Sequence, residues 1–332
     1  MTRGGAGGGH GGGAGSSVRG GLDGRRIGAH LAFAKGGMLK AAERTRAIGA
    51  TTVQVFADNP TAWRRRNGLP DELPAFRERL LELDVVPTAI HAAYIVNLAG
   101  PEDGTDFWAR SIDVLAAELG MGVAYGAAIV NVHAGSHRGQ GREAGLRQLG
   151  RGIARAIDAA DLPAGGGPRL VVENSAGGGD TLGDTVEDLA AILGSAVRAG
   201  AEADRLAFCL DTAHLWGAGV DLRDAAALDG LLQRFDDLVG PERLALIHLN
   251  DSRSTLGSRS DRHQHVGAGA IGAAGLGAVV RHPRLADVPM ILETPGMDEG
   301  YDAINMERVR LLLAGQPLPE LPPEAFELRR SR

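Results

Sequence analysis

Metal-competent side chains end four consecutive apolar stretches of the chain. The stretches "NVHAGSH", "VVENSAG", "CLDTAH" and "IHLND" carry His133, Glu173, Asp211 and His248 at or near their ends. A lone histidine or glutamate at the end of a strand more often makes an ordinary hydrogen bond or caps a helix. Four in succession fit that explanation poorly, because clustered buried carboxylates and imidazoles stay unsatisfied unless cations pair with them. The pattern therefore favours a metal centre.

Five further groups extend this set. They are His91 and Glu293 at the ends of two other apolar stretches, His214 just after the third stretch, and Asp261 and His263 in a polar loop. Five imidazoles and four carboxylates without a thiolate suit borderline divalent ions, zinc first and then manganese or iron. Nine ligands are too many for one tetrahedral ion, and they suit two or three ions with a bridging carboxylate. Such clusters are typical of phosphoryl transfer.

The elements that must position these groups form a regular alternation. Short apolar β-rich segments alternate with longer segments of helical apolar spacing, several of which end in glycine. The expected strands are residues 26–30, 51–57, 86–92, 127–134, 169–174, 206–211, 244–250 and 290–294. Eight β-then-α units predict an α/β protein with a single (β/α)8 TIM barrel, whose active site lies at the C-terminal ends of the strands. No G-x-G-x-x-G follows the first strand, so a dinucleotide fingerprint is absent.

Composition sets the limits of this barrel. Residues 1–24 are Gly-rich and predict a disordered tail, residues 25–315 the catalytic barrel, and residues 316–332 a Pro-rich charged C-terminal tail. The single cysteine, Cys209, excludes an intramolecular disulfide. No export signal and no membrane-spanning stretch is apparent, so we expect a cytoplasmic protein without a membrane partner. The net charge of −6 alone argues against a nucleic-acid partner. Bound cations would locally offset part of that charge.

Seven segments together resemble the endonuclease IV (deoxyribonuclease IV) family of apurinic/apyrimidinic endonucleases. They are "IGAH", "AIHAAYIVNL", "NVHAGSH", "VVENSAGGG", "CLDTAH", "HLNDSRSTLGSRSDRH" and "ILETP", spread over about residues 26–314. The resemblance implies a barrel with three zinc ions. By this resemblance His91, His133 and Glu173 hold the first ion, Glu173 bridges to a second held by Asp211, His248 and Glu293, and His214, Asp261 and His263 hold the third.

The resemblance also implies the reaction and the partner. The expected activity is hydrolysis of the phosphodiester 5′ to an abasic site in double-stranded DNA during base excision repair, through a metal-bridging hydroxide that Glu173 positions. It further implies a monomer without an organic cofactor that associates with the nucleoid when it acts on DNA. Residues expected to orient ligands or phosphate are His30, His137, Asn250 and Asp251. Expected DNA contacts are Asn59, Arg64, Arg65, Tyr94, Ile95, Arg253, Arg259 and Arg262. His265 and His282 are expected to be surface or structural residues.

Departures from the family pattern leave alternatives open. Ala268 lies where the family usually has a glutamate, Ala92 and Ala93 replace a polar pair, and the loop "DNPTAW" lacks the expected polar and basic residues. One alternative is a divalent-metal sugar isomerase or epimerase on the same barrel. Another is a DNA-binding relative with reduced turnover.

Overall fold

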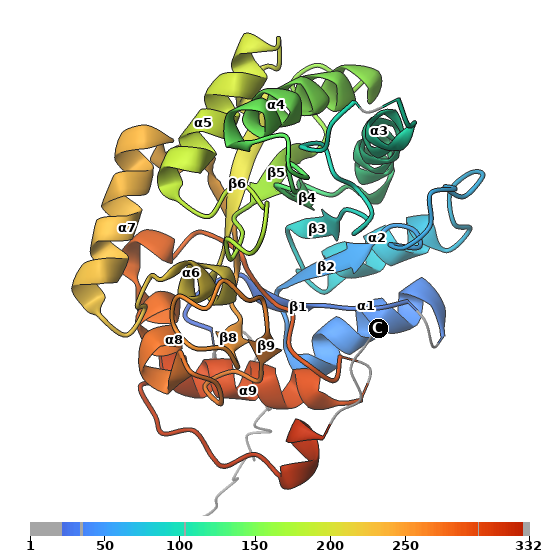
Figure 1. Ribbon diagram of the computed structural model, residues 1–332. Helices are drawn as coiled ribbons and strands as arrows, with labels where there is room; N and C mark the ends of the chain where they lie inside the picture. The colour runs from blue at the N-terminus through green and yellow to red at the C-terminus, as the bar shows by residue number, and fades with distance from the viewer. Residues whose placement is uncertain (1–21, 34–35, 103, 298, 328–332) are drawn as a thin grey trace, which may run out of the picture.

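The computed structural model describes residues 22–33, 36–102, 104–297 and 299–327, and these residues form a closed parallel barrel (Figure 1). Its strands are β1 (Ile27–His30), β2 (Thr52–Phe56), β3 (Thr88–His91), β4 (Ile129–His133), β5 (Arg169–Glu173), β6 (Leu206–Asp211), β7 (Leu244–His248) and β10 (Met290–Leu292). Each strand pairs in parallel with its neighbour, and β10 closes the barrel onto β1. The (β/α)8 prediction is therefore confirmed, and the strand ends lie close to the predicted ones.

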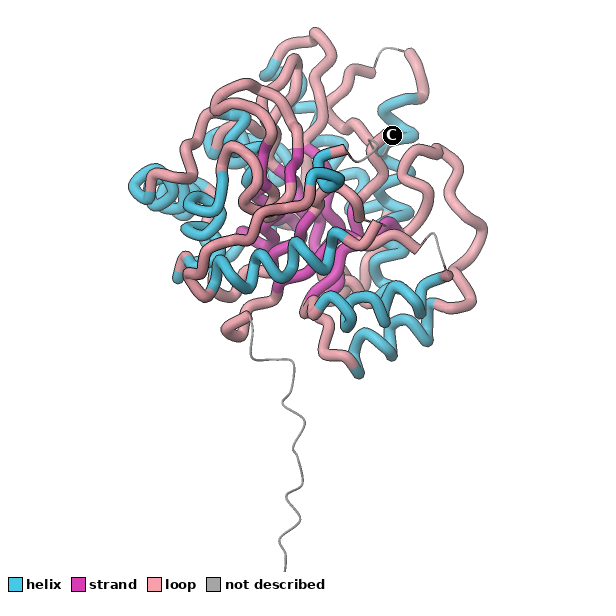
Figure 2. Tube along the Cα trace, turned by 90° about the horizontal axis from the view of Figure 1, so that it is seen from below, coloured by secondary structure: helices cyan, strands magenta, loops and turns pink. Residues whose placement is uncertain are grey.

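Helices surround the strands on the outside, as Figure 2 shows from below. They are α1 (Gly37–Ile48), α2 (Leu73–Glu82), α3 (Phe107–Tyr125), α4 (Arg142–Ala159), α5 (Val186–Arg198), α6 (Thr212–Ala218), α7 (Ala225–Leu238), α8 (Gly272–Arg281) and α9 (Tyr301–Leu313). Side-chain caps start several of them. The Thr185 hydroxyl accepts a hydrogen bond from the Asp188 backbone at the start of α5, which satisfies an otherwise unpaired N–H.

The interior of the barrel is filled by small and medium side chains. This inner layer contains Ala89, Ile129, Val171, Ala207, Cys209, Leu246 and Ile291. At the seam between β1 and β2 the backbones approach closely, because a Cβ on Gly28 would lie 1.8 Å from the Thr52 carbonyl oxygen. Glycine at this position is therefore required for the barrel to close as it does.

The long loop after β7 contains structure that the sequence analysis did not predict. The two-residue strands β8 (Asp251–Ser252) and β9 (His263–Gln264) pair antiparallel within it. This pairing folds the polar loop back over the C-terminal end of the barrel, which brings His263 close to the ends of the long strands.

The structure describes only residues 22–24 of the predicted N-terminal tail but residues 316–327 of the predicted C-terminal tail. Residues 1–21 lie outside the described part of the chain, but Leu22 is already buried and its carbonyl accepts a hydrogen bond from the Arg25 N–H at 2.8 Å. At the other end, residues 316–327 pack against the barrel and include a 3-10 turn, η5 (Pro323–Phe326). Within the described residues, no helix has the length and apolar character needed to cross a membrane.

Candidate metal centre

The C-terminal ends of the strands surround a cavity of about 700 Å³. Imidazoles and carboxylates at the ends of the long strands, on α6 and in the β8–β9 loop line it: His30, His91, His133, Glu173, His214, Asp261, His263 and Glu293. Asp211 and His248 lie beneath this lining and are fully buried. The nine predicted ligands therefore come together at one end of the barrel, which is where barrel enzymes carry their active sites.

The first group that could hold a metal ion is formed by His91, His133 and Glu173. The Glu173 Oε2 atom lies 3.8 Å from His91 Nε2 and 3.7 Å from His133 Nε2. Glu173 and His91 are buried, whereas the His133 side chain is 44% exposed and opens this group to the cavity. The Asn131 side-chain amide donates to Glu173 Oε2 at 2.6 Å and fixes the carboxylate.

A second group shares Glu173 with the first and adds Asp211, His248 and Glu293. His248 Nδ1 lies 3.3 Å from Glu173 Oε1, 3.2 Å from Glu293 Oε2 and 3.9 Å from Asp211 Oδ2. The two oxygens of one carboxylate thus face two different groups of nitrogen and oxygen donors. That arrangement is the one a bridging carboxylate requires.

The third group lies between α6 and the folded loop, around Asp211, His214 and His263. Asp261 faces both imidazoles, with its oxygens 3.2 Å from His214 Nε2 and 3.1 Å from His263 Nε2. The side chain of Asp261 is half exposed, so this group borders solvent more closely than the second group does.

Four of these imidazoles have one ring nitrogen held by a fixed partner. The contacts join His91 Nδ1 to the Ala92 carbonyl (2.7 Å), His214 Nδ1 to the Asn174 carbonyl (2.9 Å), His263 Nδ1 to the Glu293 carbonyl (2.9 Å) and His248 Nε2 to Gln54 Oε1 (3.1 Å). With an N–H donated to each oxygen, the other ring nitrogen faces the carboxylates, where it could bind a cation once it has lost any proton. Metal-ligating histidines in proteins are oriented in this way.

Three buried polar atoms without hydrogen bonds indicate that a cation fits this cluster. Glu173 Oε1, His248 Nδ1 and His263 Nε2 are buried, and each lacks a hydrogen bond among the described residues. Such atoms are costly unless something neutralises them. All three point into the groups above, and a divalent cation would satisfy them with the donor types that zinc accepts.

The histidines of the cluster differ in pKa. Burial lowers the pKa of His91 to about 4, so this imidazole is neutral near pH 7. Burial also disfavours the charged form of His263, but Asp211 and Asp261 outweigh it and raise the pKa of His263 to about 9. Burial raises the pKa of Asp261 in turn, but the nearby imidazoles of His214 and His263 outweigh it and hold that pKa well below its usual range. A cation entering this group would displace a proton from His263.

Two residues near the second group were missed by the sequence analysis. Gln54, fully buried on β2, donates to Glu293 Oε1 at 2.7 Å while its Oε1 faces His248. Cys209 also lies within reach of Glu173 and His248. Burial raises the pKa of the Cys209 thiol to about 12, so it remains a protonated thiol at neutral pH. Glutamine and cysteine inside apolar strands carry no spacing signal, although the polarity of Gln54 in "TTVQVFA" was visible.

The residues expected to orient ligands separate into two kinds. His30 lies 3.6 Å from Glu293 Oε1, and the Asn250 amide donates to Asp211 Oδ2 at 2.7 Å, so both contact the cluster directly. Asp251 and His137 have other contacts. The Asp251 carboxylate accepts hydrogen bonds from the backbone N–H groups of Gly269, Ile271 and Gly272 and holds that loop. His137 lies 3.7 Å from Asp180, away from the residues that line the cavity.

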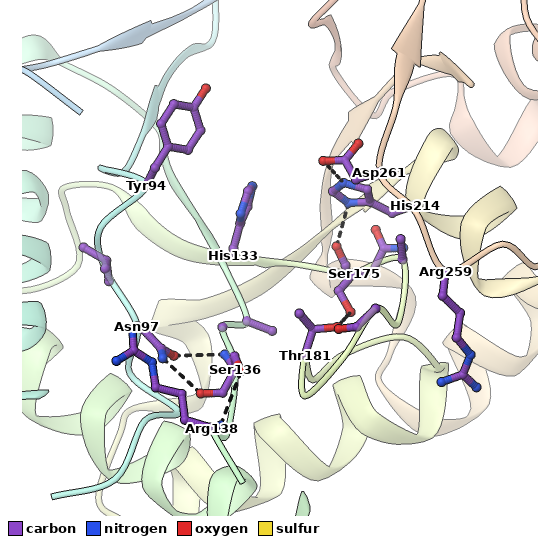
Figure 3. Close-up of a pocket in the computed structure, with 16 residues that line it drawn as sticks. Tyr94, Asn97, His133, Ser136, Arg138, Ser175, Thr181, His214, Arg259 and Asp261 are labelled. Atoms are coloured by element: carbon purple, nitrogen blue, oxygen red, sulfur yellow. Dashed lines mark hydrogen bonds and ion pairs between the residues drawn. The ribbon is translucent and has the colours of Figure 1, made fainter. Parts of the chain in front are cut away.

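The expected DNA contacts are likewise divided. Tyr94 is 59% exposed and, like Arg253 and Arg262, lines the cavity of the metal cluster. Arg259 lines a neighbouring groove of about 360 Å³ that shares Tyr94, His133, His214 and Asp261 with the first cavity (Figure 3). In Figure 3, Tyr94 and His133 lie on one side of the groove, and Asp261 and His214 lie on the other.

Arg65 does not line either cavity, and this corrects the prediction that it contacts DNA. Its guanidinium pairs with the buried Glu118 at 3.0 Å and donates to the Asn59 carbonyl at 3.0 Å. Arg64 is exposed on the same loop, and the Asn59 side chain accepts hydrogen bonds from Thr61. The arginine triplet was interpreted by charge alone, which gave no sign of the buried partner.

Three remaining residues are part of the scaffold. Ile95 is half-buried and packs against the main core. His265 is fully buried rather than at the surface, and it contacts the C-terminal segment. His282 is half-buried, and its Nδ1 accepts a hydrogen bond from the Arg284 N–H beside the turn that follows α8. Ala268 lies in the loop directly after His265, and its N–H donates to the His265 carbonyl at 2.9 Å.

Comparisons with known proteins agree with this geometry. Residues 42–314 match a family model described as a xylose isomerase-like TIM barrel. The chain is 40% identical over 290 residues to a probable endonuclease 4 of Halobacterium salinarum, covering 87% of this chain and all of that protein. It is 38% identical to the crystal structure of endonuclease IV from Thermus thermophilus, with a TM-score of 0.75 and coverage of 87% of this chain and 99% of that one.

A D-tagatose 3-epimerase-like protein shares the fold at 14% identity, with a TM-score of 0.58 and coverage of 86% of this chain and 95% of that one. At this identity the likeness concerns the barrel alone. The relatives with substantial sequence identity carry the endonuclease name over nearly their whole length. The chain therefore belongs to the endonuclease IV family of xylose isomerase-like TIM barrels.

Proposed function

We propose that this protein is a zinc-dependent endonuclease that hydrolyses the DNA phosphodiester on the 5′ side of an abasic site. The observation that carries the proposal is Glu173, whose two oxygens face two groups of ligands beside a third group around Asp261. Adjacent divalent ions in this arrangement suit the displacement of an oxygen at phosphorus. The 38% identity to a solved endonuclease IV supports the same conclusion.

The proposed ligand assignment follows the three groups. His91, His133 and Glu173 hold one zinc ion, Glu173, Asp211, His248 and Glu293 hold a second, and His214, Asp261 and His263 hold a third. When bound, the ions would supply Lewis-acid polarisation of a phosphate and activation of water near neutral pH. Because Glu173 belongs to both of the first two ligand groups, it fixes their positions relative to each other.

The surrounding residues of the chain provide the positioning of DNA. Arg253 and Arg262 line the cavity of the metal cluster and are exposed, so their guanidinium groups are available to phosphates. Arg138 and Arg259 line the adjoining groove, which continues the basic surface away from the cluster. Tyr94 lines both cavities and presents an exposed ring where the two meet. These cations offset the acidic total charge of the chain at the surface that a DNA backbone would contact.

The test of this function is strand cleavage of a duplex that contains a single tetrahydrofuran abasic analogue. The wild-type protein should nick 5′ to the analogue and leave a 3′ hydroxyl. Glu173→Gln should reduce the rate by more than ~100-fold, because even residues behind metal ligands contribute ten- to a hundredfold. The control Glu143→Gln changes an exposed carboxylate on α4 and should cleave normally. Tight binding without cleavage at any metal concentration would instead identify a DNA-binding relative.

Elemental analysis separates the nuclease from a sugar epimerase. We expect about three zinc equivalents per chain, whereas one or two manganese equivalents would favour the epimerase.

Two further experiments test the domain limits and the oligomeric state. Purification of residues 22–332 as a single barrel, with unchanged cleavage, would support the proposal that the Gly-rich tail lies outside the catalytic domain. Elution as a single chain on size exclusion would support a monomer.

A further inference from the structure

The segment after α9 returns to the mouth of the metal cavity. Residues 316–327, here called the C-terminal strap, follow the end of the family match at residue 314. The strap crosses below α9 in Figure 1 and ends in η5. The Arg308 guanidinium, buried on α9, donates to the Pro319 carbonyl at 2.6 Å, and Leu318 packs against the core beside Gly267. The first part of the strap is therefore fixed to the barrel.

His265 fixes the far end of the strap. Its buried imidazole lies with Nε2 2.9 Å from the Ala325 carbonyl, and the Asn305 amide lies 3.0 Å from Nδ1. With Asn305 donating to Nδ1, the Nε2–H is left to donate to Ala325. The Phe326 ring meets the His265 ring edge-on, with centroids 6.2 Å apart. Because His265 follows His263 by two residues, the end of the strap is tied to the loop that carries the third ligand group.

This attachment places Phe326 in the wall of the metal cavity. Ala325 and Phe326 line the same 700 Å³ cavity as His263, Glu293 and Arg262. Ala325 is buried as an anchor, whereas the Phe326 ring remains 52% exposed. A single exposed phenylalanine needs no explanation by itself. An exposed ring in contact with His265 and in the same cavity as Arg253 and Arg262 is, however, the combination of aromatic and basic side chains on which proteins stack nucleic-acid bases.

We propose that the C-terminal strap is part of the DNA-binding surface and that Phe326 stacks on a base of the duplex beside the abasic site. The inference rests on the proposed function. A missing base leaves its neighbours without a stacking partner on one face, and an aromatic side chain supplies one. Phe326 is a positioning residue in this proposal, because it contacts the DNA away from the phosphate that reacts. Tyr94 would present a second ring from the loop after β3.

Steady-state cleavage of the tetrahydrofuran duplex tests the role of Phe326. Phe326→Ala should raise KM about tenfold with kcat within about twofold, since stacking on one base is lost. Phe326→Trp should restore KM because it keeps a flat ring, whereas Phe326→Leu should not. Leu81→Ala removes a similarly exposed apolar side chain on α2, away from the cavity residues, and serves as the control.

Other results would overturn the inference. An unchanged KM in Phe326→Ala, or full rescue by leucine, would show that the ring does not stack. A lower KM would show that the strap obstructs DNA. Binding to a duplex with an uncleavable methylphosphonate 5′ to the analogue gives the same comparison without catalysis. If the wild-type protein binds this duplex but cleaves no substrate, the proposed function fails while the strap remains tested by the difference in Kd.

Discussion

Gln54 offers the sharpest test of how the metal centre is held. Its side chain joins two ligands of the second group, donating to Glu293 Oε1 at 2.7 Å and facing His248 Nε2 at 3.1 Å. Gln54→Leu keeps the approximate volume of the side chain and removes both of these contacts, together with the contact between the Gln54 amide and His30 Nδ1 at 3.0 Å. The His248 ring would lose the partner that selects its tautomer, and Glu293 would lose a donor to its carboxylate.

The expected magnitude follows from these two contacts. A hydrogen bond to a charged group contributes about 1.5–3 kcal/mol, and loss of a partner behind a metal ligand typically weakens metal binding by about 10–100-fold. We therefore expect Gln54→Leu to bind the ion of the second group about 10–100-fold more weakly. The first and third groups should change little, because the contacts of Gln54 are with His30, His248 and Glu293, none of which belongs to those groups.

Competition with a chelator measures this change. The protein is equilibrated with graded chelator, and the zinc that remains bound is measured by elemental analysis. One equivalent should leave Gln54→Leu at lower chelator concentration, and added zinc should restore cleavage. Gln148→Leu, a similar change at a buried glutamine on α4, is the matched control. Zinc retention in Gln54→Leu equal to that of the wild type would refute the idea that Gln54 holds these ligands.

Three further predictions concern the ion pair, the seam of the barrel and the protonation of the cluster. Arg65→Ala should destabilise the fold by about 1–3 kcal/mol in urea unfolding, because the buried Glu118 carboxylate keeps only the hydrogen bond from the Ala93 N–H. Gly28→Ala should destabilise the fold by at least ~3 kcal/mol or prevent folding, because the new Cβ meets a backbone carbonyl. The control Gly230→Ala, in the open middle of α7, should stabilise the fold by about 0.5–1 kcal/mol in the same assay. In the metal-free protein the pKa of His263 is raised to about 9 and nearby carboxylates also raise that of His214, so zinc binding to the third group should release more than one proton at pH 7 and strengthen as the pH rises toward 9. Calorimetry in two buffers of different ionisation enthalpy measures that release, and no buffer dependence would contradict the assignment.

The sequence allowed the cluster of imidazoles and carboxylates to be predicted because such groups are rare at the ends of apolar strands. Imidazoles and carboxylates such as His248 and Glu173 end strands that are otherwise apolar, and parallel strands of a barrel bring their ends to one rim. Gln54 was not found because a neutral polar residue in mid-strand has many ordinary explanations. Its role depends on the closure of β10 beside β1, which no local pattern encodes.

The parts that failed depended on partners far along the chain. The inward turn of Arg65 requires Glu118, 53 residues away, and the docking of the strap requires His265 to reach a carbonyl 60 residues away. Neither contact leaves a periodic signal. The arginine triplet was interpreted from its charge, and the C-terminal segment was predicted from its proline content and charge to be a tail that is either wrapped or mobile. In the folded barrel, Arg65 and the strap instead pack against these distant partners, and the sequence alone does not show which residues become buried together.

The wide spacing of the ligands along the chain has a consequence for how the protein acquires metal. From His91 to Glu293, the ligands come from strands, α6 and a loop that meet only when the barrel has closed. No fragment of the chain can assemble the centre in advance, in contrast to a zinc finger, whose ligands lie within one short segment. A divalent cation held by these residues would therefore bind the native state and shift the folding equilibrium by mass action. Metal limitation in the cell would act on this protein as a loss of thermodynamic stability as well as a loss of activity.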